Sequence, residues 1–127
     1  MRILVADDHE AVRIAMRALL GSQIGWDICG EAETGRAAIE KAKELKPDLV
    51  ILDIALPVVN GFDVAKVIKQ FYPDTAILAY SILQSEGFLH EAQRIGLDGY
   101  VSKSDGAQAL LKAVNEVQHR RTLAGSV

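Results

Sequence analysis

The feature that most constrains the fold of this 127-residue chain is a regular alternation of short apolar runs with helical patterns. The runs with strand character cover residues 3–6, 27–32, 49–52, 76–80 and 100–101. The segments with apolar residues at helical spacing cover residues 9–20, 36–45, 62–71, 86–95 and 107–119. Such alternation is typical of repeated βα units around a parallel sheet, so we predict five strands and five helices.

The composition of the apolar runs predicts where each strand lies in the sheet. The run 49–52 is apolar at every position, which suits a strand covered on both faces, whereas the run 27–32 is less apolar and suits an edge. Right-handed crossovers would then give a doubly wound α/β sheet in three layers, α/β/α. We expect a flavodoxin-like (βα)5 fold with five parallel strands in the order 2-1-3-4-5. Ligands bind such folds beyond the carboxyl ends of the strands, where the strand order reverses.

Size and composition predict one globular domain. Half of the residues are hydrophobic and a quarter are charged, and the length allows a sizeable core. We place the domain at residues 1–119. Residues 120–127 turn small and polar, and we expect a tail or the start of a linker to an output domain that is absent from this chain.

The sequence also argues against a membrane-spanning protein, a secreted protein and a nucleic-acid-binding protein. The apolar stretches are too short to span a membrane, and the first residues run into a strand without the pattern of a signal peptide. The one cysteine, Cys29, cannot form an internal disulfide, so we expect a cytoplasmic protein. A net charge of −3, with no basic run before the last residues, argues against direct nucleic-acid binding.

Polar residues follow the apolar runs where chemistry would be expected. Asp7 and Asp8 follow the first run and Asp53 the third, while Ser81 and Lys103 follow the fourth and fifth. Parallel strands bring these positions to one edge. Two carboxylates about 4 Å apart repel by roughly 4 kcal/mol at an effective dielectric near 20, so a metal ion, a lysine or a proton must offset the repulsion. The pattern therefore predicts a divalent-cation site with a reactive carboxylate.

The joint order and spacing of these residues resemble the receiver domain of two-component response regulators, over residues 3–117. The residues that carry the resemblance are Asp7-Asp8, Asp53, Pro57, Gly61, Ser81 and Lys103. Segments 6–9 and 52–61 are similar to the LuxR-type subgroup, whose receiver usually precedes a helix-turn-helix DNA-binding domain.

The resemblance implies a role for each residue at the acidic edge. Asp53 would be the phosphoacceptor, since a carboxylate can attack phosphorus and form an acyl phosphate. Asp8, Asp53 and the backbone carbonyl of Ala55 would bind Mg²⁺ directly, and Asp7 would bind it through water. Lys103 would hold a phosphoryl oxygen as a point charge.

The resemblance also implies a switch and partners. Ser81 would donate its hydroxyl to the phosphoryl group and shift inward, and Tyr100 would change rotamer with it. The donor would be a sensor histidine kinase, and the face formed by the fourth helix, fifth strand and fifth helix would control an output, expected to be transcription. The resemblance also implies that the chain can form homodimers. DNA would be reached only through an output domain outside this chain, and no membrane partner is expected. The chain would be no enzyme beyond Mg²⁺-dependent self-phosphorylation and slow autodephosphorylation.

Some positions differ from the usual pattern of receiver domains, and others set the backbone conformation of the loop after Asp53. Ile82 follows the predicted switch serine where a small residue is common, and Ala55 and Leu83 offer no polar group to position water, so we expect a long-lived phosphoryl group. Pro57 fixes φ and Gly61 permits a positive φ in the loop after Asp53.

Other interpretations stay open. The main alternative is a non-phosphorylated pseudo-receiver that serves as a protein-docking module. A haloacid-dehalogenase-type phosphatase would need a second acid where Ala55 stands, and Asp7-Asp8 would repel a flavin phosphate. Taken singly, Ser81, Lys103 and Tyr100 could be an ordinary loop serine, a surface lysine and a packed strand aromatic. His9 beside the acidic pair is expected to be a surface histidine of a first helical turn.

Overall fold

The computed structural model describes residues 1–56, 59–82 and 86–125. Within these residues, five strands alternate with five α-helices, as predicted. They are β1 Arg2–Ala6, α1 Glu10–Gly21, β2 Asp27–Ala32, α2 Gly35–Leu45, β3 Leu49–Leu52, α3 Gly61–Phe71, β4 Ala76–Ser81, α4 Glu86–Ile95, β5 Gly99–Ser102 and α5 Gly106–Gly125. A short 3₁₀ helix, Lys103–Asp105, joins β5 to α5.

The strands form one parallel sheet in the order β2-β1-β3-β4-β5, which confirms the predicted flavodoxin-like topology. The register brings the strand ends level: Ala6 at the end of β1 pairs with Leu52 at the end of β3, and Ser81 pairs with Ser102 at the ends of β4 and β5. The residues that follow these strands therefore emerge at one edge of the sheet.

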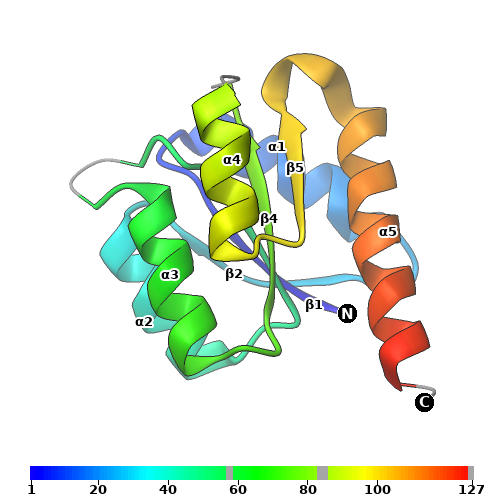
Figure 1. Ribbon diagram of the computed structural model, residues 1–127. Coiled ribbons are helices and arrows are strands. Elements are labelled where there is room, and N and C mark those ends of the chain that lie inside the picture. Colours follow the sequence, from blue (N-terminus) through cyan, green and yellow to red (C-terminus); the bar gives the residue numbers. More distant parts are fainter. Residues whose placement is uncertain (57–58, 83–85, 126–127) are drawn as a thin grey trace.

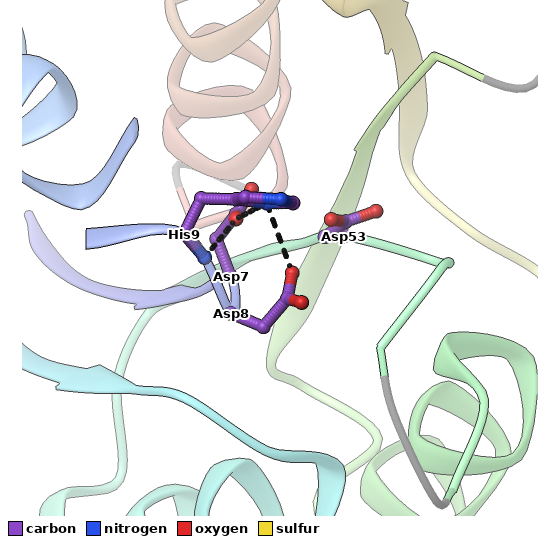
Figure 2. Close-up of side chains that lie close together, drawn as sticks. All are labelled: Asp7, Asp8, His9 and Asp53. Atoms are coloured by element: carbon purple, nitrogen blue, oxygen red, sulfur yellow. Dashed lines mark hydrogen bonds and ion pairs between the residues drawn. The ribbon is translucent and has the colours of Figure 1, made fainter. Parts of the chain in front are cut away.

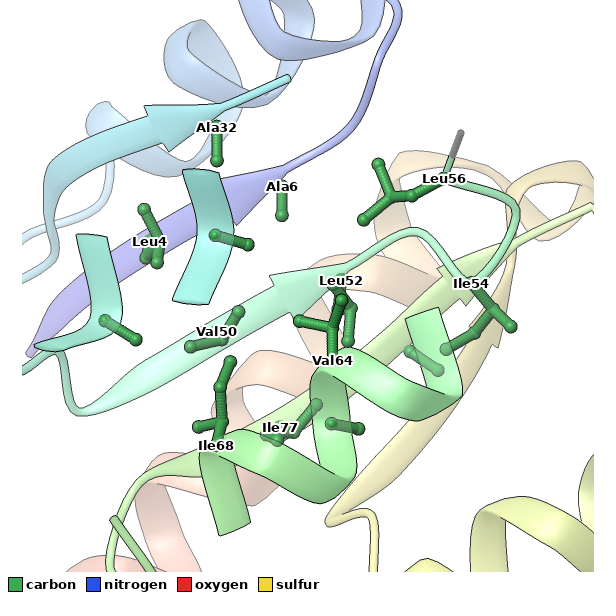
Figure 3. Packing of buried hydrophobic residues seen from close by; sticks show 14 of the residues in the cluster. Leu4, Ala6, Ala32, Val50, Leu52, Ile54, Leu56, Val64, Ile68 and Ile77 are labelled. Atoms are coloured by element: carbon green, nitrogen blue, oxygen red, sulfur yellow. The ribbon is translucent and has the colours of Figure 1, made fainter. Parts of the chain in front are cut away.

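Helices cover both faces of the sheet, with α2, α3 and α4 on one face and α1 and α5 on the other (Figure 1). Successive strand residues point to opposite faces of the sheet, so alternate residues of one strand pack into two different hydrophobic cores, one on each face. Leu4, Val50 and Ile77 pack with α2 and α3, as Figure 3 shows, whereas Ile51 and Leu78 pack with α1 and α5. All four residues of β3 are buried, as expected for a run that is apolar at every position.

Side-chain caps fix where two helices begin. The Thr34 hydroxyl accepts a hydrogen bond from the Ala37 N–H at 3.1 Å and caps the start of α2. The Asn60 side chain accepts from the Asp63 N–H at 3.1 Å and starts α3. The second cap fixes the end of the loop that leaves Asp53, so it bears on the site.

Helix α5 runs to Gly125, six residues beyond the predicted end at His119. The polar residues that suggested a tail are bonded to the domain. Arg120 donates to the Asp98 carbonyl at 2.6 Å, and Arg121 donates to the Asp74 carbonyl at 2.6 Å and to the Asp48 carboxylate at 3.3 Å. These bonds tie the last turns of α5 to the amino-terminal edge of the sheet. None of the helices in the described ranges combines the length and apolarity needed to cross a membrane.

Candidate functional site

The buried part of the site consists of Asp7 and Asp53, which continue the ladders of the two central strands. The Asp7 N–H donates to the Ala32 carbonyl at 3.0 Å, and the Asp53 N–H donates to the Ala6 carbonyl at 2.9 Å. Both side chains are nearly inaccessible, at 1 % and 4 % exposure. The strand ends thus bring two buried carboxylates to the same edge, as the sequence predicted.

Lys103 supplies the cation that these carboxylates require. Its ammonium donates to Asp7 Oδ2 at 2.7 Å and to Asp53 Oδ2 at 3.1 Å from the 3₁₀ turn after β5. Burial lowers the pKa of Lys103, but the hydrogen bonds and charges of the two carboxylates outweigh burial and raise that pKa above its ordinary value. Lys103 therefore stays positively charged. Of the metal ion, lysine or proton that could offset the repulsion between the carboxylates, the structure shows the lysine.

Asp8 and His9 form the outer part of the site. Asp8 is 33 % exposed, and His9 Nδ1 lies 3.0 Å from Asp8 Oδ1 and 3.2 Å from Asp7 Oδ1. The backbone N–H of His9 also donates a hydrogen bond to Asp7 Oδ1 at 2.9 Å. Figure 2 shows these side chains gathered next to the Asp53 carboxylate. One ligand atom from each of Asp7, Asp8, His9 and Asp53 lies within 4.8 Å of the others.

This arrangement fits a divalent cation. Three carboxylates supply oxygen atoms, and the exposed Asp8 leaves a side open to water, which Mg²⁺ retains when it binds protein. The Ala55 N–H donates to Asp53 Oδ1 at 2.9 Å and orients that carboxylate. The use of the Ala55 carbonyl as a metal ligand stays a prediction.

The glycine after the acceptor loop is needed for a reason different from the predicted one. Gly61 is not among the residues with positive φ. A Cβ at Gly61 would lie 2.4 Å from Ile54 Cα and 2.7 Å from the Asp53 carbonyl oxygen. Close approach of two backbone segments therefore excludes a side chain here. Pro57, which we predicted to shape the same loop, lies outside the described residues.

Ser81 ends β4 and Tyr100 lies on β5, and their role as a switch pair stays a prediction. Ser81 is fully buried at the end of β4, beside the site. Ile82 follows it with 72 % exposure, whereas Leu83 is not among the described residues. The Tyr100 ring on β5 packs against Phe88 of α4, with centroids 4.8 Å apart.

Two residues at the site have roles that the sequence analysis missed. Arg13 of α1 is 8 % exposed and donates to the Asp7 backbone carbonyl at 2.8 Å. Arg13 lies on the buried face of α1 with Met16 and Leu20. A positively charged residue on the apolar face of a helix that follows an acidic pair was the sequence signal that could have revealed this role. Tyr80 places its ring 5.9 Å from the Lys103 ammonium, and burial raises the pKa of its hydroxyl. An aromatic residue just before Ser81 gave only a weak signal.

Fold and site together define a receiver-like signalling domain, and comparison with known proteins identifies its family. Residues 3–115 match the response regulator receiver domain, so the chain belongs to that family. Receiver domains of response regulators are signalling modules.

Relatives include both single-domain and longer regulators. Chemotaxis protein CheY of Thermotoga maritima is 34 % identical over 116 residues, which cover 91 % of this chain and 96 % of that protein. Transcriptional regulatory protein LnrK of Bacillus subtilis is 35 % identical over 92 % of this chain, but only 53 % of that protein is covered. The chain thus spans about half the length of several curated relatives, including GacA of Pseudomonas viridiflava, of which it covers 55 %.

A solved structure confirms the subgroup. A two-component response regulator of the LuxR family from Aurantimonas superposes with a TM-score of 0.87 at 31 % identity, covering 91 % of this chain and 83 % of that one.

Proposed function

We propose that this chain is the phospho-acceptor domain of a two-component response regulator, with Asp53 as the acceptor and a sensor histidine kinase as the donor. The observation that carries the proposal is the environment of the Asp53 carboxylate. One oxygen is held by the Ala55 N–H and the other by the Lys103 ammonium, in a cluster of acidic ligands at the end of a central strand.

The proposed reaction is transfer to a carboxylate. An Asp53 oxygen attacks the phosphorus atom, the bond from phosphorus to the donor's histidine nitrogen breaks, and an acyl phosphate forms. Asp53 is buried among fixed partners, so the nucleophile is already oriented. Lys103 reaches Asp53 before transfer and is placed to bind a phosphoryl oxygen afterwards.

Mg²⁺ is the proposed cofactor. Asp8, Asp53 and the Ala55 carbonyl would hold it directly, and Asp7 would hold it through water. When bound, it supplies positive charge that stabilises the transferring phosphoryl group.

Phosphorylation adds about −1.5 to −2 charges beside Ser81. We propose that the Ser81 hydroxyl bonds the phosphoryl group and that Tyr100 changes rotamer against Phe88, so that the face of α4, β5 and α5 is altered. The added charge would thus bias a two-state equilibrium rather than create a new fold.

The lifetime of the acyl phosphate follows from the residues around the acceptor. Ile82 is exposed beside the site, and Ala55 carries no polar side chain that could position a water molecule. We propose slow hydrolysis for this reason.

The wider role is proposed from the relatives. Some of them are longer transcriptional regulators, so an output domain beyond residues 120–127 would bind DNA, and the receiver would act in the cytoplasm, with homodimers as one way to transmit the signal. The division into a receiver and a connection to an output domain belongs to the same proposal, with residues 120–125 in the last helix of the receiver and not in the connection.

Intact-mass measurement after incubation with a small phosphodonor, with and without Mg²⁺, tests the acceptor. We expect an alkali-labile adduct of one phosphoryl group that requires Mg²⁺ and is absent in Asp53→Asn. Asp27→Asn, which changes an exposed carboxylate at the start of β2, is the matched control and should keep the adduct. A folded wild-type chain with no adduct would contradict the proposal and favour the docking-module alternative, with Ile82→Ala as the next variant.

A further inference from the structure

We propose that His9 is a metal ligand that sets the specificity of this site, so that Ni²⁺ and related transition-metal ions are strongly preferred over Mg²⁺. The inference rests on the cation site of the proposed function and goes beyond it, because the ligands assigned there are all oxygen atoms.

The position of the imidazole carries the inference. His9 Nδ1 lies 3.0 Å from Asp8 Oδ1 and 3.2 Å from Asp7 Oδ1, so it lies beside two carboxylates (Figure 2). Lys103 contacts the other oxygen of Asp7, Oδ2, at 2.7 Å. The lysine and the histidine therefore address opposite oxygens of the same carboxylate, and the lysine does not occupy the place where His9 and Asp8 converge.

The local backbone holds His9 beside the carboxylates, where its ring nitrogen lies within hydrogen-bond distance of Asp7 Oδ1. His9 is the N-cap residue of α1, with extended backbone angles, and its side chain makes no capping hydrogen bond. Its own N–H is anchored on Asp7 Oδ1 at 2.9 Å. The side chain is 66 % exposed, so a hydrated cation can reach the ring nitrogen.

The chemistry of the ligand atoms then predicts the preference. Mg²⁺ favours oxygen ligands and retains several waters, so it gains little from a nitrogen atom. Imidazole nitrogen binds Co²⁺, Ni²⁺, Cu²⁺ and Zn²⁺ well, and affinity rises from Mn²⁺ to Cu²⁺ for a given set of ligands. One imidazole among carboxylates thus favours the transition-metal ions over Mg²⁺.

Titration calorimetry with Mg²⁺ and Ni²⁺ separates this role from others. The chain has three histidines, so a background with His90→Gln and His119→Gln leaves His9 as the only imidazole. Both of those residues are exposed on α4 and α5. We expect His9→Asn in this background to weaken Ni²⁺ binding by about tenfold or more and Mg²⁺ binding by less than about threefold. Asparagine is a favourable N-cap and keeps a hydrogen-bond donor, so the variant should fold.

A spectroscopic measurement checks the bond itself. With Mn²⁺ as the probe, pulsed electron paramagnetic resonance should detect a directly coordinated nitrogen in the background protein and lose it in His9→Asn.

The outcomes are distinct. Equal weakening of Mg²⁺ and Ni²⁺ in His9→Asn, with no nitrogen signal, would show that His9 only donates hydrogen bonds to the carboxylates and would overturn the inference. Failure of the background protein to bind Mg²⁺ at all would instead overturn the cation site of the proposed function, and the inference with it. Asp8→Asn should weaken both ions and is the positive control.

Discussion

At the scale of single residues, Lys103 allows two buried carboxylates to stand side by side without a metal. Its ammonium bridges Asp7 and Asp53, which are almost fully buried. Its removal would take away the ammonium that both buried charges share, which is costly even after partial relaxation.

We expect Lys103→Met to lower the free energy of unfolding by about 1–3 kcal/mol at neutral pH in a chelating buffer. The pKa of Lys103 is raised in the folded state, so its contribution is fully present below the unfolded pKa of about 10.4 and is lost as pH rises through the higher folded value. The difference between wild type and variant should therefore shrink in strongly alkaline solution. Urea unfolding between neutral pH and about pH 11 would measure it.

Lys112→Met, at an exposed position of α5, is the matched control and should change stability little at any pH. A difference between wild type and Lys103→Met that grows with pH would contradict the assignment.

At the scale of elements, the strands and most helix boundaries could be predicted, but the contacts of α5 could not. The alternation of apolar runs is a local signal, and the predicted bounds of β2 and α4 agree with the structure. The final turns of α5 depend instead on Arg120 and Arg121 reaching backbone carbonyls far away in the sequence. The local sequence does not reveal hydrogen-bond partners that are distant in the chain, so residues 120–125 were predicted to be a tail.

We expect the double change Arg120→Met and Arg121→Met to loosen the last turns of α5 and to lower the free energy of unfolding by about 1 kcal/mol, since these bonds are largely exposed. Hydrogen exchange of the peptide that covers residues 120–125 should become faster. Arg36→Met on the exposed side of α2 is the control. Unchanged exchange in the double variant would mean that helix propensity alone maintains these turns.

At the scale of the whole molecule, the sequence was sufficient for the topology and for the acidic edge, because strand ends in a parallel sheet have a fixed place. It was insufficient for side chains that reach the site from other elements. Arg13 holds the Asp7 carbonyl from α1, and the close approach of Gly61 to Ile54 is a property of the folded loop. The hydrogen bond and the close approach both arise only when the helices and loops pack against the sheet.

The cation site joins segments that are far apart in the unfolded chain, so metal binding should stabilise the fold. A cation that binds only the folded state adds about 2.7 kcal/mol at a concentration of 100 times its dissociation constant. We expect Mg²⁺ to raise the thermal midpoint of wild type and of the control Asp27→Asn, and to have little effect on Asp8→Asn. Thermal unfolding followed by the fluorescence of Trp26, the only tryptophan, would measure it. A full Mg²⁺ effect in Asp8→Asn would place the ion elsewhere.

The Lys103 bridge has a consequence for the order of events at the site. The three carboxylates and the Lys103 ammonium together carry two net negative charges. An anionic phosphoryl donor that meets these groups without a metal is repelled, whereas a divalent cation is attracted and cancels that charge. Under the proposed function, the encounter is therefore ordered, with the cation arriving first and the donor second.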